Sequence, residues 1–263
     1  MIRVLVNGCG GKMGREVVRA VAGQNDLELV GAVDLSHEGE DAGVLAEIGT
    51  TGVKVETDLK KAIAKTKPQV VVDFTSPAVI FDNAKTVLSA GVSMVIGTTG
   101  LTAEQREALS AISKETGANA LIAPNFSLGA VLLMKVSEEI SRYLPNAEII
   151  ELHHNHKYDA PSGTAKLTAE KMARARREEP EEDKTTESIP GARGANYEGM
   201  HIHSVRLPGY VAHQEVLFGG YGEILTLRHD SLDRKSFMPG VILACKKVLK
   251  VPGVTYGLEN YLD

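Results

Sequence analysis

The residues of this sequence best suited to chemistry lie in one stretch from Glu151 to Thr164, ELHHNHKYDAPSGT. His153, His154, His156 and Lys157 fall within five consecutive positions of it. Histidine exchanges protons near neutral pH and serves as a general acid or base, and lysine adds a cation. We therefore expect proton donors to gather where a strand runs into a loop.

The end of the same stretch predicts anion binding. Ser162, Gly163 and Thr164 stand where the next helix is expected to begin. A helix N-terminus presents unpaired backbone N–H groups and a partial positive charge, which favour an anion, and the two hydroxyls add donors. A cation beside such a helix start is typical of a carboxylate site.

Two other interpretations of this stretch remain open from the residues alone. One is a zinc site built from His153, His154 and His156, and the other is a solvated polar loop. Alternation along a strand sends His153 and His154 to opposite faces, which argues against both binding one metal. His201 and His203 lie two residues apart, so the same alternation puts them on one face of a strand. This pattern is explained by the strand alone and does not require a functional role.

A second candidate site is the glycine-rich segment from Val6 to Gly14, VNGCGGKMG, which follows a predicted strand and opens a predicted helix. Glycines there let the backbone approach a pyrophosphate that faces the helix N-terminus. Asp34 ends the second strand 34 − 14 = 20 residues later, the separation expected for an acid that binds the adenosine ribose. A tight turn without a ligand is the alternative. The residues assigned to this cofactor site are Gly8, Gly11, Lys12, Met13, Gly14 and Asp34.

The choice between NADH and NADPH depends on two charges in this segment. The carboxylate of Asp34 prefers a free ribose 2′-hydroxyl and repels a 2′-phosphate, so it favours NADH. Lys12 is a cation in the loop that can meet a 2′-phosphate. We therefore expect NADH, NADPH or both.

Three more loops follow the carboxyl ends of predicted strands, at 73–77, 97–100 and 123–127. Ligands bind at this edge of an open α/β sheet, although each loop taken singly can be a mere helix cap. The residues of these loops assigned to the cofactor are Phe74, Thr75, Gly97, Thr98, Thr99, Pro124, Asn125 and Phe126.

The first half of the chain alternates short β-branched runs with amphipathic stretches, which predicts a parallel sheet covered by helices. The strands are expected at 2–6, 28–33, 69–73, 93–96 and 119–122. Ser76 with Pro77 predicts one helix start, and the capping box that begins at Thr102 predicts another. Residues 35–52 show no clear period and are expected to be irregular.

The second half has a different texture, that of an α+β domain with a mixed or antiparallel sheet. We expect helices at 129–143 and 162–177, strands at 148–154, 201–207, 212–218 and 223–229, and a final helix at 237–249. The glycines at 219–222 predict a hairpin between the last two strands. The mixed charges at 174–187 are expected to be a solvated helix end and loop.

Length and composition set outer limits. The chain has 263 residues, 43% of them hydrophobic, and a net charge of −5, which is ordinary for a globular protein of one or two domains. No basic run favours nucleic acid, and no apolar run approaches the ~20 residues that span a bilayer. We expect a cytoplasmic protein in which Cys9 and Cys245 are plain thiols.

The segments GCGGKMG, DFTSP, IGTTG, APNFS and EIIELHHNHKYDAPSGTA stand in the order and approximate spacing of one family. The sequence closely resembles the 4-hydroxy-tetrahydrodipicolinate (dihydrodipicolinate) reductases over essentially its whole length. The resemblance implies a dinucleotide-binding domain, 1–126 joined by 237–263, and a substrate-binding and oligomerisation domain, 127–236. It further implies a homotetramer, a small cyclic dicarboxylate substrate and NAD(P)H-dependent reduction with loss of water, in lysine and diaminopimelate synthesis, without a metal.

The resemblance also implies roles for single residues. His153 would be the general acid, and Lys157 the substrate cation and a proton donor. The dicarboxylate would be held by His154, Ser162, Gly163 and Thr164, while the loops at 98–99 and 125–126 would flank the nicotinamide. Arg234 matches a family arginine near the substrate more loosely. The family often has a basic residue after the acid that ends the second strand, but here Asp34 is followed by Leu-Ser-His.

Two rival functions are weaker. A semialdehyde dehydrogenase needs a nucleophilic cysteine near mid-chain, whereas Cys9 and Cys245 lie near the ends. A sensor that binds NADH without turnover needs a DNA-binding or partner-binding module, and no helix-turn-helix with a basic face is evident in the sequence.

Overall fold

The computed structural model describes residues 1–262. The chain divides into two compact units, one made of Met1–Phe126 with Phe237–Asp263 and the other of Ser127–Ser236.

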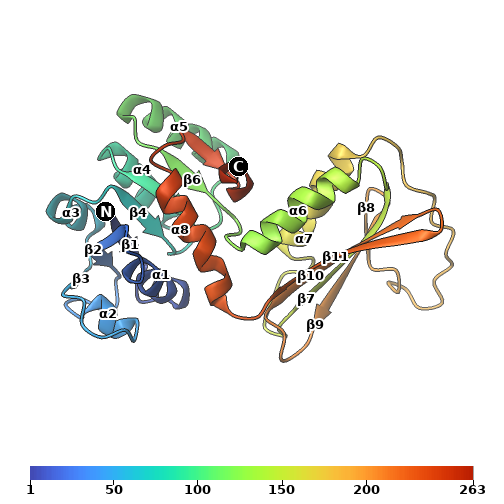
Figure 1. Cartoon of the computed structure of the whole chain (residues 1–263), viewed down its shortest axis with the longest axis horizontal. Coiled ribbons are helices and arrows are strands. Elements are labelled where there is room, and N and C mark those ends of the chain that lie inside the picture. The colour runs from blue at the N-terminus through green and yellow to red at the C-terminus, as the bar shows by residue number, and fades with distance from the viewer. Residues whose placement is uncertain (263) are drawn as a thin grey trace. The chain divides into compact units, whose positions relative to one another are not determined.

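The first unit is built on a seven-stranded sheet, shown in Figure 1. Its spatial order is β12-β6-β5-β4-β1-β2-β3, and every neighbouring pair is parallel. The strands are β1 Ile2–Asn7, β2 Leu27–Val33, β3 Val55–Glu56, β4 Val70–Asp73, β5 Ser93–Ile96, β6 Ala120–Ile122 and β12 Val254–Tyr256. The chain thus returns from its C-terminal part to add the edge strand β12.

Helices cover both faces of this sheet (Figure 1). One layer holds α3 Leu59–Thr66, α4 Ile80–Ser89 and α5 Ala103–Thr116, and the other holds α1 Lys12–Ala22 and α8 Met238–Lys247. Because both faces are covered, the central strands read as continuous apolar runs, and β4 and β5 are buried along their whole length. The short helix α2 Ala42–Leu45 follows β2, and the 3-10 turn Leu258–Tyr261 follows β12.

The second unit is built on a five-stranded mixed sheet of order β11-β10-β7-β9-β8. Its strands are β7 Asn146–His153, β8 Ala195–Tyr197, β9 Met200–Arg206, β10 Ala212–Gly220 and β11 Glu223–Ser231. β7 and β9 are parallel, and the other pairs are antiparallel. A 3-10 turn, Arg234–Phe237, leads out of the unit.

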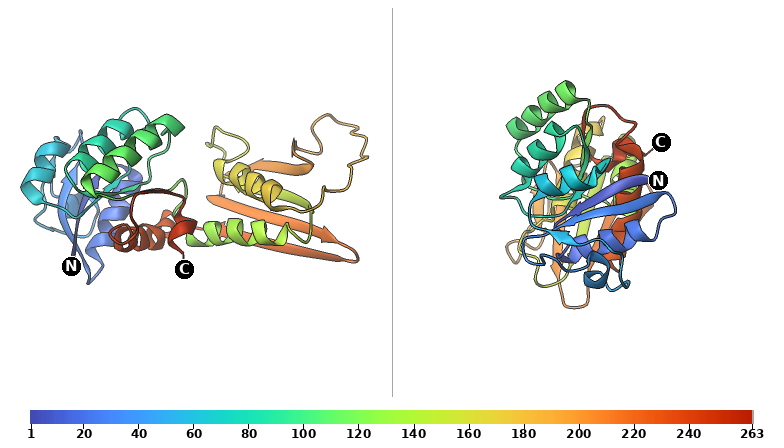
Figure 2. Two further views of the ribbon diagram at one scale, coloured as in Figure 1. Left: turned by 90° about the horizontal axis from the view of Figure 1, so that it is seen from above. Right: turned by 90° about the vertical axis from the view of Figure 1, so that its left-hand side faces the viewer.

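Helices α6 Leu128–Ile140 and α7 Gly163–Ala175 pack on one face of this sheet, as the views in Figure 2 show. Their apolar residues join those of the strands in a core that includes Leu133, Ile149, Met172, Ile202 and Phe218. Alternation along the strands puts every second side chain in this core. The opposite face of the sheet carries no helix of this unit.

Most predicted elements are confirmed, including the two fold classes, the hairpin of β10 and β11, and the capping box of Thr102 with Gln105. The start predicted at Ser76 and Pro77 is wrong, since α4 begins only at Ile80. The carbonyl of Ser76 instead accepts bonds from Val79 and Ile80, so residues 77–79 form a separate turn before the helix.

The segment 35–52 is more ordered than predicted. Asp41 is buried, and its carboxylate accepts hydrogen bonds from the backbone N–H groups of Gly43, Val44, Thr51 and Gly52. These bonds nucleate α2 and close the loop on itself. They also lower the pKa of Asp41 to about 2, because they stabilise the charged form.

In residues 1–262, the helices are all too short or too polar to cross a membrane. Cys9 and Cys245 are free, buried thiols whose pKa burial raises to about 12, so neither is a ready nucleophile.

Candidate active site

The glycine-rich loop of the first unit joins β1 to α1 in a tight turn. Gly8 adopts φ 81°, a left-handed conformation that a side chain would strain. Gly14, in the first turn of α1, lies against the carbonyl of Gly8, and a Cβ there would come within 1.9 Å of that oxygen. The sequence of the loop therefore determines how closely the helix start approaches the strand end.

The start of α1 fits a dinucleotide pyrophosphate. Its N-cap is Gly11, which offers no side-chain hydrogen bond to the first turn, and Lys12 and Met13 follow. A helix start without a side-chain cap keeps its N–H groups for an anion, and the missing side chains leave room for one. Gly8, Gly11, Lys12, Met13 and Gly14 all lie in this turn, as predicted.

Asp34 lies directly beside the same loop. Its carboxylate accepts hydrogen bonds from the backbone of Gly10, at 2.9 Å, and of Ser36, at 2.9 Å. His37 also borders Gly10, and its ring pairs with Glu40. The acid at the end of β2 is therefore placed where a ribose bound to the loop would be met.

A buried carboxylate at the end of β4 connects two of the other predicted loops. Asp73 accepts hydrogen bonds from the Thr75 backbone and hydroxyl and from the Thr98 hydroxyl, at 2.7–3.1 Å. Asn7 and Asn83 donate to its second oxygen. The loops after β4 and β5 are thereby fixed to each other.

The remaining candidates of this unit lie along the same loops. Gly97 lies against the Phe74 ring, whose centroid is 5.7 Å from that of Phe126. Thr99 and Pro124 are exposed, while Phe126 is buried. The structure thus brings the loops after β1, β4, β5 and β6 to the carboxyl edge of one parallel sheet.

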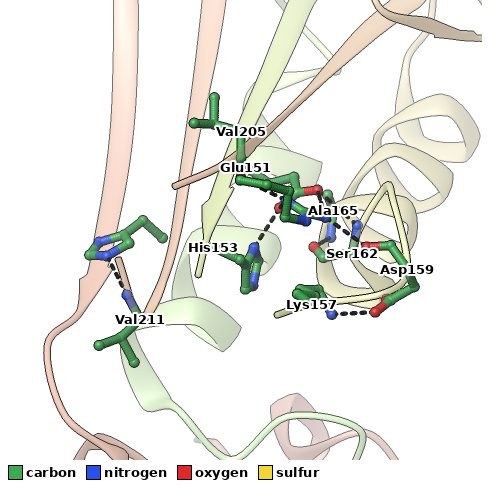
Figure 3. A network of polar contacts seen from close by, with 10 residues as sticks. Glu151, His153, Lys157, Asp159, Ser162, Ala165, Val205 and Val211 are labelled. Carbon is green, nitrogen blue, oxygen red and sulfur yellow. Dashed lines mark hydrogen bonds and ion pairs between the residues drawn. The ribbon is translucent and has the colours of Figure 1, made fainter. Parts of the chain in front are cut away.

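In the second unit, the site begins where β7 ends (Figure 3). His153 is the last residue of β7, and its Nδ1 forms a hydrogen bond with Oε2 of Glu151, 2.5 Å away. Glu151 is completely buried, and Arg206 on β9 reaches both of its oxygens, at 2.9 and 2.7 Å. Burial opposes ionisation of Glu151, but the hydrogen bonds from His153 and Arg206 prevail and lower its pKa to about 2.

The loop after β7 carries the other titratable candidates. Lys157 Nζ pairs with Asp159 at 2.7 Å, which lowers the pKa of the Asp159 carboxyl (Figure 3). The pKa of His154 is also lowered, first by burial and then by the positive charges of His153, His156, Arg234 and Lys157. Nδ1 of His154 is buried without a hydrogen-bond partner in the described part of the chain.

The start of α7 closes the site. Ser162 is buried as the N-cap, where its hydroxyl accepts from Ala165 and its backbone N–H donates to Glu151. Gly163 is exposed with open space around its Cα, and Thr164 is half-buried. The predicted anion-binding helix start therefore lies beside the predicted proton donors.

The same geometry bears on the alternatives. Among residues 1–262, no group of three or more His, Cys, Asp or Glu side chains is placed to hold a metal ion. His203 pairs with Glu148, and His201 contacts the Arg193 carbonyl. Both histidines therefore make structural contacts within the second unit.

The sequence reasoning missed Arg206 and Asp159 as parts of this site. Arg206 reaches Glu151 because β9 runs parallel to β7 with Arg206 in register with His153. No local motif signals a pairing between segments about fifty residues apart.

Comparison with known proteins agrees with this geometry. The family model described as "Dihydrodipicolinate reductase, N-terminus" matches residues 2–126, and its C-terminal counterpart matches residues 129–262. The 4-hydroxy-tetrahydrodipicolinate reductase of Moorella thermoacetica is 50% identical over 100% of this chain and 98% of its own length. That of Listeria monocytogenes is also 50% identical, over 100% of both chains.

Solved structures give the same result. A dihydrodipicolinate reductase from Paenisporosarcina sp. TG-14, solved with dipicolinate bound, superposes with a TM-score of 0.89 and 42% identity, covering 100% of both chains. An amine dehydrogenase from Mycobacterium smegmatis has a TM-score of 0.71, 14% identity and coverage of 98% of this chain and 95% of its own, and shares the fold alone.

A parallel sheet with a glycine-rich loop of the dinucleotide-binding type, followed by a separate unit in which histidine and lysine side chains cluster, is typical of an NAD(P)H-dependent oxidoreductase. The chain belongs to the dihydrodipicolinate reductase family. Its function is the reductase step of lysine and diaminopimelate biosynthesis.

The close approach in the glycine loop generates a first prediction. Gly14→Ala should strongly lower the melting temperature of the enzyme and weaken NADH binding, because the added Cβ meets the Gly8 carbonyl at 1.9 Å. Gly11→Ala is the matched control, since its Cβ would lie 3.5 Å from the same oxygen, an ordinary contact. Thermal unfolding without cofactor measures the difference, and equal melting temperatures for the two variants would contradict the packing described.

Proposed function

We propose that this reductase converts 4-hydroxy-2,3,4,5-tetrahydrodipicolinate to 2,3,4,5-tetrahydrodipicolinate, with loss of water, and binds it through the cluster at the end of β7. The observation that carries this proposal is that His153, His154 and Lys157 gather beside the N-terminus of α7, with Nδ1 of His154 buried and without a hydrogen-bond partner in residues 1–262. A lysine cation and imidazole donors next to a helix N-terminus favour an anionic ligand. A dicarboxylate supplies two negative charges in one small molecule.

The helix start of α7 supplies the second half of this binding site. Backbone N–H groups and the hydroxyls of Ser162 and Thr164 would hold one carboxylate, and Lys157 and His154 the other. Dipicolinate bound to the Paenisporosarcina relative is a ring dicarboxylate of the same kind. Lys157 would leave Asp159, its partner in this structure, to bind the substrate.

His153 is the proposed proton donor. Its Nδ1 faces Glu151, which leaves Nε2 to deliver a proton to the ring carbon that becomes carbanion-like during reduction. Lys157 is the second candidate for donating this proton, because its ammonium group lies in the loop that directly follows His153. Neither role requires a metal.

The first unit would hold the dinucleotide. Gly8, Gly11, Lys12, Met13 and Gly14 would take the pyrophosphate, and Asp34 the adenosine ribose. The loops at 98–99 and 125–126 would flank the nicotinamide, and Phe74, Thr75, Gly97 and Pro124 would also contact the cofactor. When bound, the reduced nicotinamide supplies the hydride, while the chain's residues orient the reactants and donate the proton.

We further propose a homotetramer assembled through the second unit's sheet. The face without helices carries half-buried Ile150 and Leu217, together with Ile224, which is 76% exposed. Apolar side chains on an uncovered sheet face favour burial against another copy. We also place the enzyme in the cytoplasm, where NADH and NADPH are supplied, and expect no nucleic-acid partner for an acidic chain.

The division of labour generates a second prediction. His153→Ala should lower kcat by ~10²–10⁴ with a smaller change in KM, because it removes a general acid. Lys157→Ala should lower kcat and raise KM together, because it removes a contact and a proton source. His154→Ala should fall between them, and NADH affinity should change little in all three. Wild-type kcat in both His153→Ala and Lys157→Ala, or loss of activity with a chelator, would refute the proposed roles.

The charges near the ribose generate a third prediction, on cofactor choice. Asp34 should make NADH at least as good a substrate as NADPH, and Lys12→Ala should selectively reduce the activity with NADPH. Steady-state kinetics at low salt measure this. A kcat/KM for NADPH more than about tenfold higher than for NADH, a gap of ~1.4 kcal/mol, would show that the assigned role of Asp34 is wrong.

The uncovered sheet face generates a fourth prediction. Light scattering at micromolar concentration should give a mass about four times the monomer mass of 28.1 kDa. Ile224→Lys, which puts a charge on that face, should shift the mass toward smaller species. A monomer mass for the unmodified protein would exclude the proposed assembly.

A further inference from the structure

Glu151 is an unusual residue to find inside the second unit. Its side chain is completely buried, yet it stays ionised because hydrogen-bond donors surround it, namely His153, Arg206, Ser204 and the backbone N–H of Ser162. Burying an ion pair seldom adds net stability by comparison with apolar residues of similar volume. The pair of Glu151 and Arg206 therefore calls for a reason other than stability.

The contact with His153 supplies that reason. Glu151 Oε2 lies 2.5 Å from Nδ1 of the imidazole, so the proton of Nδ1 is directed at the carboxylate. A carboxylate in this position fixes the ring orientation and the tautomer, and it stabilises the imidazolium form. Nε2 is then the nitrogen from which a proton can leave.

Arg206 extends the same constraint to the loop and to α7. One guanidinium nitrogen, Nη2, donates both to Glu151 and to the backbone carbonyl of Asp159, at 2.7 Å each. Asp159 in turn binds Lys157, and the Ser162 N–H that begins α7 donates to Glu151. One ion pair thus links the proposed acid, the proposed substrate cation and the anion-binding helix start, most of which Figure 3 displays.

We propose that Glu151 and Arg206 are positioning residues for the reduction: Glu151 holds His153 with the transferable proton on Nε2, and Arg206 holds Glu151 and the loop of Lys157 in place. This inference rests on the proposed function of His153 as the acid. During turnover the Nε2 proton passes to the carbanion-like ring carbon while the Nδ1 proton stays directed at Glu151. The imidazole ring of His153 becomes neutral, and Glu151 remains ionised throughout. A proton from the solvent then restores the Nε2–H group.

Glu151→Gln tests this directly. Glutamine has nearly the same volume and keeps an acceptor for Ser162 and Arg206, but it has no charge with which to stabilise the imidazolium. We expect kcat to fall by about 10–10³-fold, with KM for the substrate and NADH affinity changing less than about threefold. Glu151→Asp, which keeps the charge, should recover part of the loss.

Two further readouts separate positioning from a structural role. The pH above which kcat declines should move to lower pH in Glu151→Gln, because an imidazolium without its anion gives up its proton more easily. The other charged or titratable groups near Glu151 and His153 are unchanged in the variant, namely Arg206, Lys157, His154 and Asp159. Nitrogen-15 NMR of the histidine rings should show the Nδ1–H tautomer of His153 in the wild type at high pH and a mixture in Glu151→Gln.

The chain provides a matched control three residues earlier on the same strand. Glu148 pairs with His203 at 2.7 Å, so Glu148→Gln also removes a carboxylate from a carboxylate–histidine pair in this sheet. It should leave kcat, the pH profile and the His153 tautomer unchanged. Light scattering and thermal unfolding of both variants verify that each remains assembled and folded.

The outcomes are distinguishable. Wild-type kcat, pH profile and His153 tautomer in Glu151→Gln, alongside an impaired His153→Ala, would overturn the positioning role and leave the proposed function intact. Wild-type kcat in His153→Ala would overturn both. If Glu151→Gln fails to fold, Arg206→Lys gives the test, because it keeps a charge but loses the two-pronged contact. It should lower kcat at least about tenfold if the pair positions the site, and an unchanged kcat would refute the pair's role.

Discussion

The buried negative charge of Glu151 is the constraint on which the chemistry of the second unit depends. A carboxylate that has lost all contact with water must be surrounded by donors, and here they come from β7, β9 and the start of α7. Each of these segments also carries or adjoins a residue of the proposed site. Satisfying one charge therefore brings together the proposed proton donor, the proposed substrate cation and the helix start proposed to bind the anion.

In the first unit, too, a buried carboxylate holds neighbouring segments together. Asp73 is a buried carboxylate at the end of β4, and its bonds to Thr75 and Thr98 fix two loops that the proposal assigns to the cofactor. Loops at the edge of a sheet are otherwise mobile, and binding pays for ordering them. A buried carboxylate whose oxygens accept several hydrogen bonds orders them before the ligand arrives. In both units the acid lies at or near the end of a strand, where the strand gives way to a loop of the proposed site.

The sequence predicts most of the first unit's sheet because its strands are largely apolar, and β4, β5 and β6 are buried along their whole length. Strands β1, β2, β4, β5 and β6 are predicted nearly to the residue. Strands β3, β8 and β12 have only two or three residues and, unlike the equally short β6, are not buried along their whole length, so no apolar run marks them. They exist because a neighbouring strand pairs with them. The helix start expected at Ser76 fails because a turn across 77–79 precedes the helix.

The candidate site divides in the same way. Residues that follow one another, such as the cluster of His153, His154 and Lys157, are visible in the sequence as a motif. Arg206 is invisible there, because its role depends on the parallel register between β7 and β9. Asp159 stands inside the motif, but only the folded loop shows that it holds Lys157. The sequence therefore reveals the residues proposed to do chemistry more readily than the residues that hold them in place.

The most direct measurement is calorimetric titration of the NADH-saturated enzyme with dipicolinate near pH 7, repeated in buffers of different ionisation heat. Burial and neighbouring cations lower the pKa of His154 and so disfavour its imidazolium form in the free enzyme. A bound dianion stabilises the imidazolium, so binding should take up protons from the buffer, and His154→Gln should reduce both the uptake and the affinity. Binding heats that are independent of the buffer, or unchanged affinity and uptake in His154→Gln, would contradict a dicarboxylate site in this cluster.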